Sequence, residues 1–170
     1  MKDEISPRDG IKFLPHFPTV LVGTGTGNKS NLITVAMVHV FSIDPPMIGI
    51  GISPKRHSFK LLEEHGEFTV NIPDKEMLEE VKDCGSTSGE DTDKFKDFDL
   101  TREQGGNTVV PGVRECPLIL ECEQEKRIET GDHHWFVGEV VNAMKSKEFK
   151  RSEAILYWSG EFRTPGKLLE

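Results

Sequence analysis

Two β-rich runs joined by a proline-containing turn most constrain how this chain can fold. Val35–Phe41 and Met47–Ser53 are dominated by apolar and β-branched residues, and the turn Ile43–Pro46 separates them. This order predicts two consecutive strands. In the second strand, Gly49 and Gly51 alternate with isoleucines, so one face is nearly bare backbone. Such a face suits close approach of a flat ligand, or tight packing within the sheet.

A basic segment directly follows the second strand. Lys55 and Arg56 precede Ser58, and the run Phe59–His65 has the pattern of a short helix that ends at Gly66. We expect Ser58 to be the N-cap and Gly66 the residue that ends the helix. Free backbone N–H groups, a hydroxyl and two cations would then converge, as phosphate binding requires. A capped surface helix preceded by solvated charges fits the same residues.

Length and composition predict one globular domain that spans residues 1–170. Of the residues, 35% are hydrophobic and 29% are charged, which is ordinary for a soluble protein. The formal net charge of −8 argues against binding to nucleic acid or to an anionic membrane, because both require a basic surface. The N-terminal residues lack a secretory pattern and no apolar run reaches the length of a membrane span, so a cytoplasmic protein is expected.

The three cysteines indicate no metal site and no disulfide framework. Cys84, Cys116 and Cys122 are odd in number and form no CxxC pair. Cys122 alternates with leucines in a strand pattern, and Cys84 lies at helical spacing from apolar residues. These patterns favour buried structural thiols over redox-active ones.

The rest of the sequence predicts a β-rich domain with short helices. Strands are expected at Thr19–Thr24, Leu32–Phe41, Met47–Ser53, Phe68–Ile72, Leu118–Arg127, His134–Met144 and Ala154–Tyr157. Besides Phe59–His65, a helix is expected at Lys75–Cys84, with Asp74 as its N-cap and Gly85 just past its end. The irregular polar region from Gly85 to Pro117 is long enough to be a functional loop.

A glycine-rich run, Val22–Asn28, superficially resembles a nucleotide-binding loop. A dinucleotide fingerprint or a P-loop would open a helix, whereas the residues that follow here have a strand pattern. A hairpin turn at Gly25–Lys29 is therefore the better interpretation.

Two neighbouring histidines stand where a turn enters a strand. His133 and His134 should face opposite sides of the sheet, so that one can face a pocket while the other does not. Taken alone, such a pair is more typical of a surface or an interface than of catalysis.

Short motifs in a fixed order run along nearly the whole chain. They are Asn31-x-x-Thr34, Asp44-Pro45-Pro46, Arg56-His57-Ser58, Glu67-Phe68-x-Val70-Asn71, Cys84-Gly85 with Ser88-Gly89, Asp93-Lys94-Phe95, Gly131-Asp132-His133, Gly138-Glu139-Val140 and Tyr157-x-x-Gly160-x-Phe162-Arg163. In this order they resemble the flavin reductase-like, flavoredoxin-type proteins. The resemblance implies a mainly β fold, the FMN-binding split β-barrel with short flanking helices.

The resemblance also assigns residues to an FMN site. Those that would contact the cofactor are Asn31, Thr34, Met37, Arg56, Ser58, Lys94, His133 and Phe162. Arg56 and Ser58 would hold the phosphate, and Lys94 and His133 would lie near the ring or the phosphoribityl chain. His133 is also the one candidate for a catalytic role. Met37 departs from the family pattern, which can have an aromatic residue there, although a thioether can still pack on a flavin face.

The reaction implied by the resemblance is NAD(P)H-dependent reduction of a flavin or of ferric iron through bound FMN. NADH or NADPH would deliver hydride to the flavin, which carries out the electron transfer. Two alternatives stay open: a flavoredoxin-like electron carrier that depends on a redox protein partner, and a noncatalytic flavin-binding module. A homodimer with the flavin near the subunit interface is expected, because a second subunit would enclose the flat ring.

Overall fold

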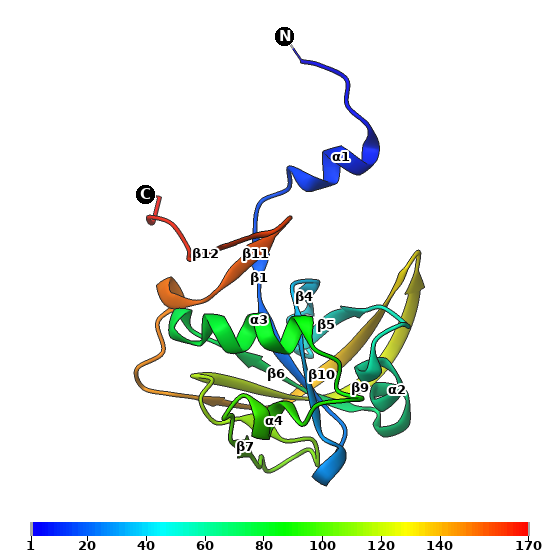
Figure 1. Cartoon of the computed structure of the whole chain (residues 1–170), viewed down its shortest axis with the longest axis vertical. Coiled ribbons are helices and arrows are strands. Elements are labelled where there is room, and N and C mark those ends of the chain that lie inside the picture. The colour runs from blue at the N-terminus through cyan, green and yellow to red at the C-terminus, as the bar shows by residue number, and fades with distance from the viewer. Residues whose placement is uncertain (1, 170) are drawn as a thin grey trace.

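The computed structural model describes residues 2–169 and is mainly β, as predicted (Figure 1). Its main sheet has seven strands, in the spatial order β3 (Asn31–Val35), β2 (Val20–Thr24), β6 (Glu67–Ile72), β9 (Leu118–Thr130), β10 (His133–Lys145), β5 (Met47–Ile52) and β4 (Val38–Ser42). All neighbouring strands are antiparallel. Strand β3, at one edge, also contacts β5 near the other edge, so the sheet curls back on itself.

Short elements surround this curled sheet. A small sheet contains β1 (Phe17–Pro18), β11 (Leu156–Trp158) and β12 (Glu161–Arg163), and β7 (Arg102–Glu103) pairs with β8 (Gly112–Val113). The α-helices are α1 (Pro7–Lys12), α2 (His57–His65), α3 (Leu78–Ser86) and α4 (Lys94–Asp97), and 3₁₀ turns span Gly27–Lys29, Lys75–Met77 and Arg151–Glu153. Helix α1 stands away from the sheet (Figure 1). Among residues 2–169, no helix is long and apolar enough to cross a membrane.

The prediction of one strand at Leu32–Phe41 is wrong. The chain leaves β3 after Val35 and begins β4 at Val38, and these two strands lie at opposite edges of the seven-stranded sheet. Between them, the carbonyl of Met37 accepts a hydrogen bond from the backbone N–H of Gly51 at 2.7 Å. The apolar run is continuous, but its two halves pair with different strands, and this crossing brings the two edges of the sheet together.

The bare face of β5 is filled by side chains of this chain. A Cβ atom at Gly49 would lie 2.3 Å from the ring of Phe41, and one at Gly51 would lie 2.9 Å from the Cβ of Met37. Of the two interpretations of the alternating glycines, tight packing within the sheet is therefore the one that the structure supports. Met37 packs against the core at this point.

Both predicted helices form, with different ends. Helix α2 begins at His57 with Arg56 as its N-cap, so Ser58 is not the cap; Gly66 ends the helix with φ of 65°, as predicted. Asp74 caps the 3₁₀ turn before α3. The prediction that Gly85 lies past the end of the helix is wrong, because α3 continues to Ser86.

Two apolar cores lie on the two faces of the sheet. The first fills the inside of the curled sheet beneath α2 and includes Phe68 and Phe136. The second lies between the outer face of β2 and β3 and helices α3 and α4, and includes Leu21 and Phe95. Strands β2 and β3 are therefore covered on both faces, which fixes their position relative to α2 and α3.

The long region predicted to be irregular is ordered by a buried carboxylate. Glu121 of β9 is 1% exposed and accepts hydrogen bonds from the backbone N–H groups of Gly106, Asn107 and Thr108 at 2.8–3.1 Å. A Cβ atom at Gly105 would overlap the Glu121 carboxylate, so only glycine fits there. The connection between α4 and β9 is thus pinned to the sheet at its middle.

Candidate functional site

Two adjoining hollows lie between β3, α2 and α3. The first, which we call the polar cavity, has a volume of about 180 Å³ and is lined by Asn31, Ile33, residues 55–58, residues 84–89 and Lys94. The second, the aromatic hollow, has about 350 Å³ and is lined by Thr34, Ala36, Arg56, Val81, Lys82, Gly85, Ser86, Tyr157 and Phe162. Arg56, Gly85 and Ser86 line both, so the two hollows form one continuous site.

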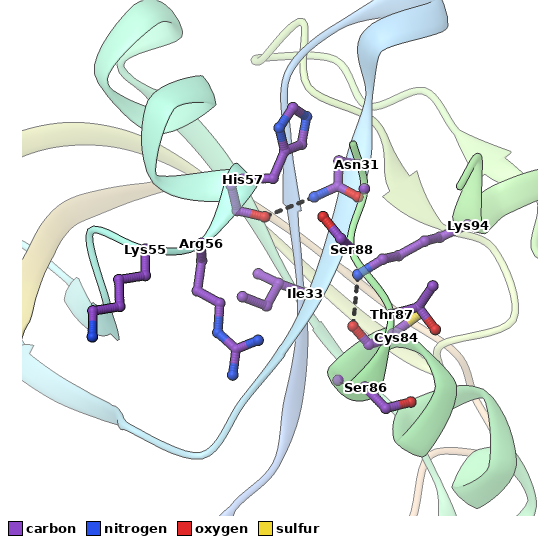
Figure 2. Close-up of a pocket in the computed structure, with 13 residues that line it drawn as sticks. Asn31, Ile33, Lys55, Arg56, His57, Cys84, Ser86, Thr87, Ser88 and Lys94 are labelled. Carbon is purple, nitrogen blue, oxygen red and sulfur yellow. Dashed lines mark hydrogen bonds between the residues drawn. The ribbon is translucent and has the colours of Figure 1, made fainter. Parts of the chain in front are cut away.

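The polar cavity is open to the start of α2. In its first turn, backbone N–H groups have no carbonyl partner within the helix, and the helix dipole makes this end positive. Lys55 and Arg56 add two cations from the residues just before the helix. Figure 2 shows these two side chains on one side of the cavity, with Asn31, Ser88 and the end of Lys94 on the other. This arrangement favours an anionic group.

A buried hydrogen bond joins β3 to α2 at the wall of the polar cavity (Figure 2). The side-chain amide of Asn31 donates to the Ser58 hydroxyl at 2.8 Å. Ser58 Oγ accepts this bond, so its own proton remains free to donate. Asn31 is 4% exposed, yet its Oδ1 atom is buried and has no partner among the described residues. Because buried polar atoms are usually satisfied, this acceptor indicates a ligand that carries a hydroxyl or N–H donor.

Lys94 is a buried cation at the opposite wall. It is 2% exposed, and its ammonium donates to the carbonyls of Leu32 and Cys84 at 2.8 and 2.7 Å. Burial, opposed by Cys84 and helped by the nearby charge of Arg56, lowers the pKa of Lys94 to about 8. At neutral pH the ammonium is still mostly protonated, and two of its three donors hold β3 and α3 together.

The cysteines are buried and free, as predicted. Burial raises the pKa of Cys84 to about 12 and that of Cys122 to about 12, and it raises the pKa of Cys116 well above its ordinary value. Because the thiolate is the reactive form, these thiols are inert at neutral pH. Cys84 therefore lines the polar cavity with an uncharged side chain.

The aromatic hollow offers a surface for a flat ring. Tyr157 and Phe162 lie with their ring centroids 4.6 Å apart at an interplanar angle of 43°. On the other side, the hydroxyl of Thr34 donates to the carbonyl of Val81, which leaves the side-chain methyl for apolar contact. A Cβ atom at Gly85 would lie 3.2 Å from the Cβ of Thr34, so glycine lets the end of α3 pack closely on β3.

The structure brings together six of the eight residues expected at the site. Asn31, Arg56, Ser58 and Lys94 line the polar cavity, and Thr34, Arg56 and Phe162 line the aromatic hollow. Met37 and His133 line neither.

His133 lies at the start of β10, at the tip of the long hairpin that β9 and β10 form. Its Nδ1 atom is 2.8 Å from an oxygen of Asp132. The ring of His134 instead meets the ring of Phe59 edge-on, with centroids 5.1 Å apart. The expected cofactor role of His133 stays a prediction.

Residues that were not predicted from the sequence come from the end of α3, from the loop that follows it and from β11. Ser86, Thr87, Ser88 and Gly89 line the polar cavity, and Tyr157 lines the aromatic hollow. The signal for the loop was present: a run of small polar residues and glycine directly after a helix is typical of a segment that approaches a ligand with its backbone. Nothing local in the sequence indicates that β11 would reach α3.

The fold and the two-part site define a class of protein. The curled antiparallel sheet matches the split β-barrel of solved flavoredoxin structures, and this confirms the expected fold. The chain belongs to the family described as flavin reductase like domain, whose family model matches residues 15–166.

The chain is also similar to individual relatives and solved structures. The chain is 34% identical over 140 residues to an uncharacterized protein of Archaeoglobus fulgidus, a match that covers 82% of this chain and 78% of the relative. It is 25% identical over 158 residues to NADH:riboflavin 5′-phosphate oxidoreductase of Streptomyces pristinaespiralis, covering 93% and 86%. The crystal structure of flavoredoxin from Methanosarcina acetivorans is 26% identical, with a TM-score of 0.88 over 100% of this chain and 94% of the other.

Proposed function

We propose that this chain binds FMN and acts as an NAD(P)H-dependent flavin reductase. The observation that carries the proposal is the joining of the polar cavity, built for an anion and a hydroxyl-bearing chain, to a hollow lined by Tyr157 and Phe162. A phosphorylated polyol attached to a flat ring has these groups in this order. The name of the Streptomyces relative, an NADH:riboflavin 5′-phosphate oxidoreductase, supports the same cofactor and electron donor.

The roles of the residues follow from their chemistry. The start of α2, with Arg56 and the free proton of Ser58, would hold the phosphate. The unpartnered Asn31 Oδ1 would accept from a ribityl hydroxyl. Phe162 would contact the ring, as expected from the sequence, and Tyr157 supports Phe162.

FMN, when bound, supplies the redox chemistry by taking electrons from a reduced nicotinamide and passing them to an acceptor. The chain contributes binding, orientation and charge. Protonated Lys94 places a buried positive charge at the wall of the site, where it stabilises negative charge on a ligand more strongly than it would in water.

A flavoredoxin-like electron carrier is the second candidate, favoured by the 26% identity and TM-score of 0.88 to the Methanosarcina flavoredoxin. Anaerobic stopped-flow mixing of the FMN-loaded protein with NADH or NADPH separates the two functions. A reductase should lose its flavin absorbance rapidly with a nicotinamide cofactor alone, whereas a carrier should require a reduced redox protein. Absence of redox change with both kinds of donor would contradict both functions and indicate a noncatalytic flavin-binding module.

The phosphate assignment predicts that FMN binds more tightly than riboflavin. Arg56→Ala should weaken FMN binding about tenfold to a hundredfold, since a hydrogen bond to a charged group contributes about 1.5–3 kcal/mol. Riboflavin, which has no phosphate, should bind the variant and the wild type about equally. Titration by flavin fluorescence measures both affinities, and Arg114→Ala, an exposed arginine outside both hollows, is the matched control. Equal affinity for FMN and riboflavin in the wild type would place the phosphate elsewhere.

The lowered pKa of Lys94 leads us to predict that FMN binding depends on pH. Its ammonium attracts the phosphate while it is protonated, and it loses its proton as the pH rises through the pKa of about 8. FMN affinity should therefore fall about threefold to tenfold between pH ~7 and ~9.5, because binding is linked to one proton. Lys94→Met should remove this dependence, whereas the exposed Lys96→Met should keep it. A dependence of the same size in Lys94→Met would assign the titration to another group.

We also propose that the chain forms a homodimer through the β4 edge of the sheet. β4 is an edge strand, and Val40, Phe41 and Ile43 on it and its turn are 56%, 45% and 82% exposed. The ring of Phe41 lies 5.4 Å from that of Trp135, which extends the apolar surface onto β10. An apolar edge strand left uncovered is prone to pair with another chain.

Sedimentation equilibrium tests the dimer. The wild type should sediment as a dimer at micromolar concentration, and Ile43→Asp should shift it toward the monomer, because a charge would be buried in the interface. Val109→Asp, at a residue that is also exposed but lies far along the chain from β4, should remain dimeric. A monomeric wild type with full FMN occupancy would show that one chain completes the site.

A further inference from the structure

Three hollows lie in a row across the site. The polar cavity shares Arg56, Gly85 and Ser86 with the aromatic hollow, and it shares His57 and Gly89 with a third hollow of about 570 Å³. This outer groove lies between α2, the turn after β2 and residues 89–93. A ligand with its ring in the aromatic hollow and a phosphate in the polar cavity therefore has the outer groove beyond its phosphate end.

The boundary between the polar cavity and the outer groove is formed by the segment Ser88–Glu90, which we call the strap. The backbone N–H of Glu90 donates to the Ser88 hydroxyl at 3.2 Å, which closes a tight turn. A Cβ atom at Gly89 would lie 2.1 Å from Asn31 Oδ1, so the strap packs directly on the wall of the cavity. Figure 2 shows Ser88 beside Asn31 at this wall.

Glu90 connects the strap to α2 across this boundary. Its Oε1 atom lies 3.7 Å from Nδ1 of His57 and 3.6 Å from the ammonium of Lys60. His57 Nδ1 is buried and has no hydrogen-bond partner within residues 2–169, so the carboxylate is the nearest charged group that faces it. The same carboxylate neutralises Lys60, which is a cation of the outer groove.

We propose that Glu90 makes the site selective for a flavin mononucleotide over a flavin dinucleotide. The inference rests on the proposed function. The phosphate of a mononucleotide is terminal and fits behind the strap. A dinucleotide continues through a second phosphate, which has to pass between His57 and Gly89 into the outer groove. There it meets the Glu90 carboxylate at short range, and like charges at such a distance repel strongly near a protein surface.

The outer groove strengthens this discrimination. Glu64, Asp91 and Asp93 also line it, and of its two lysines Lys60 is paired with Glu90. The negative charge of Asp93 is balanced by Arg102 at 3.0 Å, and Glu64 and Asp91 have no ion-pair partner among the described residues, but Glu90 is the acidic group that lies against His57 at the boundary itself. Removal of the Glu90 charge would both end the repulsion and free Lys60 to bind a second phosphate.

Calorimetric titration of the flavin-free full-length protein with FMN and with FAD tests the proposal. The wild type should bind FMN at least about tenfold more tightly than FAD, and Glu90→Gln should tighten FAD binding about fivefold to tenfold, as expected for the removal of one negative charge at a partly exposed site. The FMN affinity of Glu90→Gln should stay within about twofold of the wild-type value, because the phosphate of FMN does not reach the outer groove. A folding defect would weaken the binding of both ligands. The ratio of the FAD affinity to the FMN affinity therefore reports the proposed role alone.

Two further variants sharpen the test. Adding Lys60→Gln to Glu90→Gln should reduce the gain in FAD affinity, because the freed cation is then gone and only the relief of repulsion remains. Glu63→Gln also removes one negative charge, from the helix α2 that Glu90 faces but outside all three hollows, and should leave the ratio of FAD to FMN affinity unchanged. Equal binding of FAD and FMN by the wild type, or an unchanged ratio in Glu90→Gln, would overturn the inference while leaving the proposed function intact. Failure of the wild type to bind FMN would overturn both.

Discussion

The curling of the seven-stranded sheet is the constraint on which the site depends. Residues 36 and 37 carry the chain from β3, at one edge, to β4, at the other, and the curl returns β3 to the neighbourhood of β5 and α2. The Asn31–Ser58 hydrogen bond fastens that return. A flat sheet would leave β3 far from α2, and the anion-binding helix start would then have no opposite wall.

Lys94 shows how the same groups can serve stability and function. Its ammonium joins β3 to α3 through two carbonyls, yet burial lowers its pKa to about 8, which means that the folded chain holds this charge at a cost. The cost is present at neutral pH and fades as the pH rises through about 8. An anion in the polar cavity would offset it, so ligand binding and folding would support each other at this residue.

The charge of the polar cavity is opposite in sign to the net charge of the chain. The formal charge is −8, but Lys55, Arg56, Lys94 and the start of α2 surround the polar cavity with positive potential. Acidic groups gather just outside, in the outer groove. Under the proposed function, a gradient of this kind would attract one phosphate into the cavity and disfavour a longer, more highly charged ligand, and Glu90 lies at the boundary between the two charged regions.

The sequence by itself determined features that depend on neighbouring residues. Gly66 ends α2, Asp74 caps the turn before α3, and residues 25–29 turn β2 into β3, because turn and cap energies act over a few residues. The ordered motifs also included four polar residues that line the polar cavity, Asn31, Arg56, Ser58 and Lys94. The single strand expected at Leu32–Phe41 and the capping role of Ser58 were wrong, because pairing partners and the competing Asn31 side chain come from elsewhere in the fold. Only the tertiary structure decided that Met37 fills the space over Gly51, that Tyr157 meets α3, and that Glu90 reaches Lys60. Strand pairing and burial are set by contacts between distant segments, and no local pattern contains them.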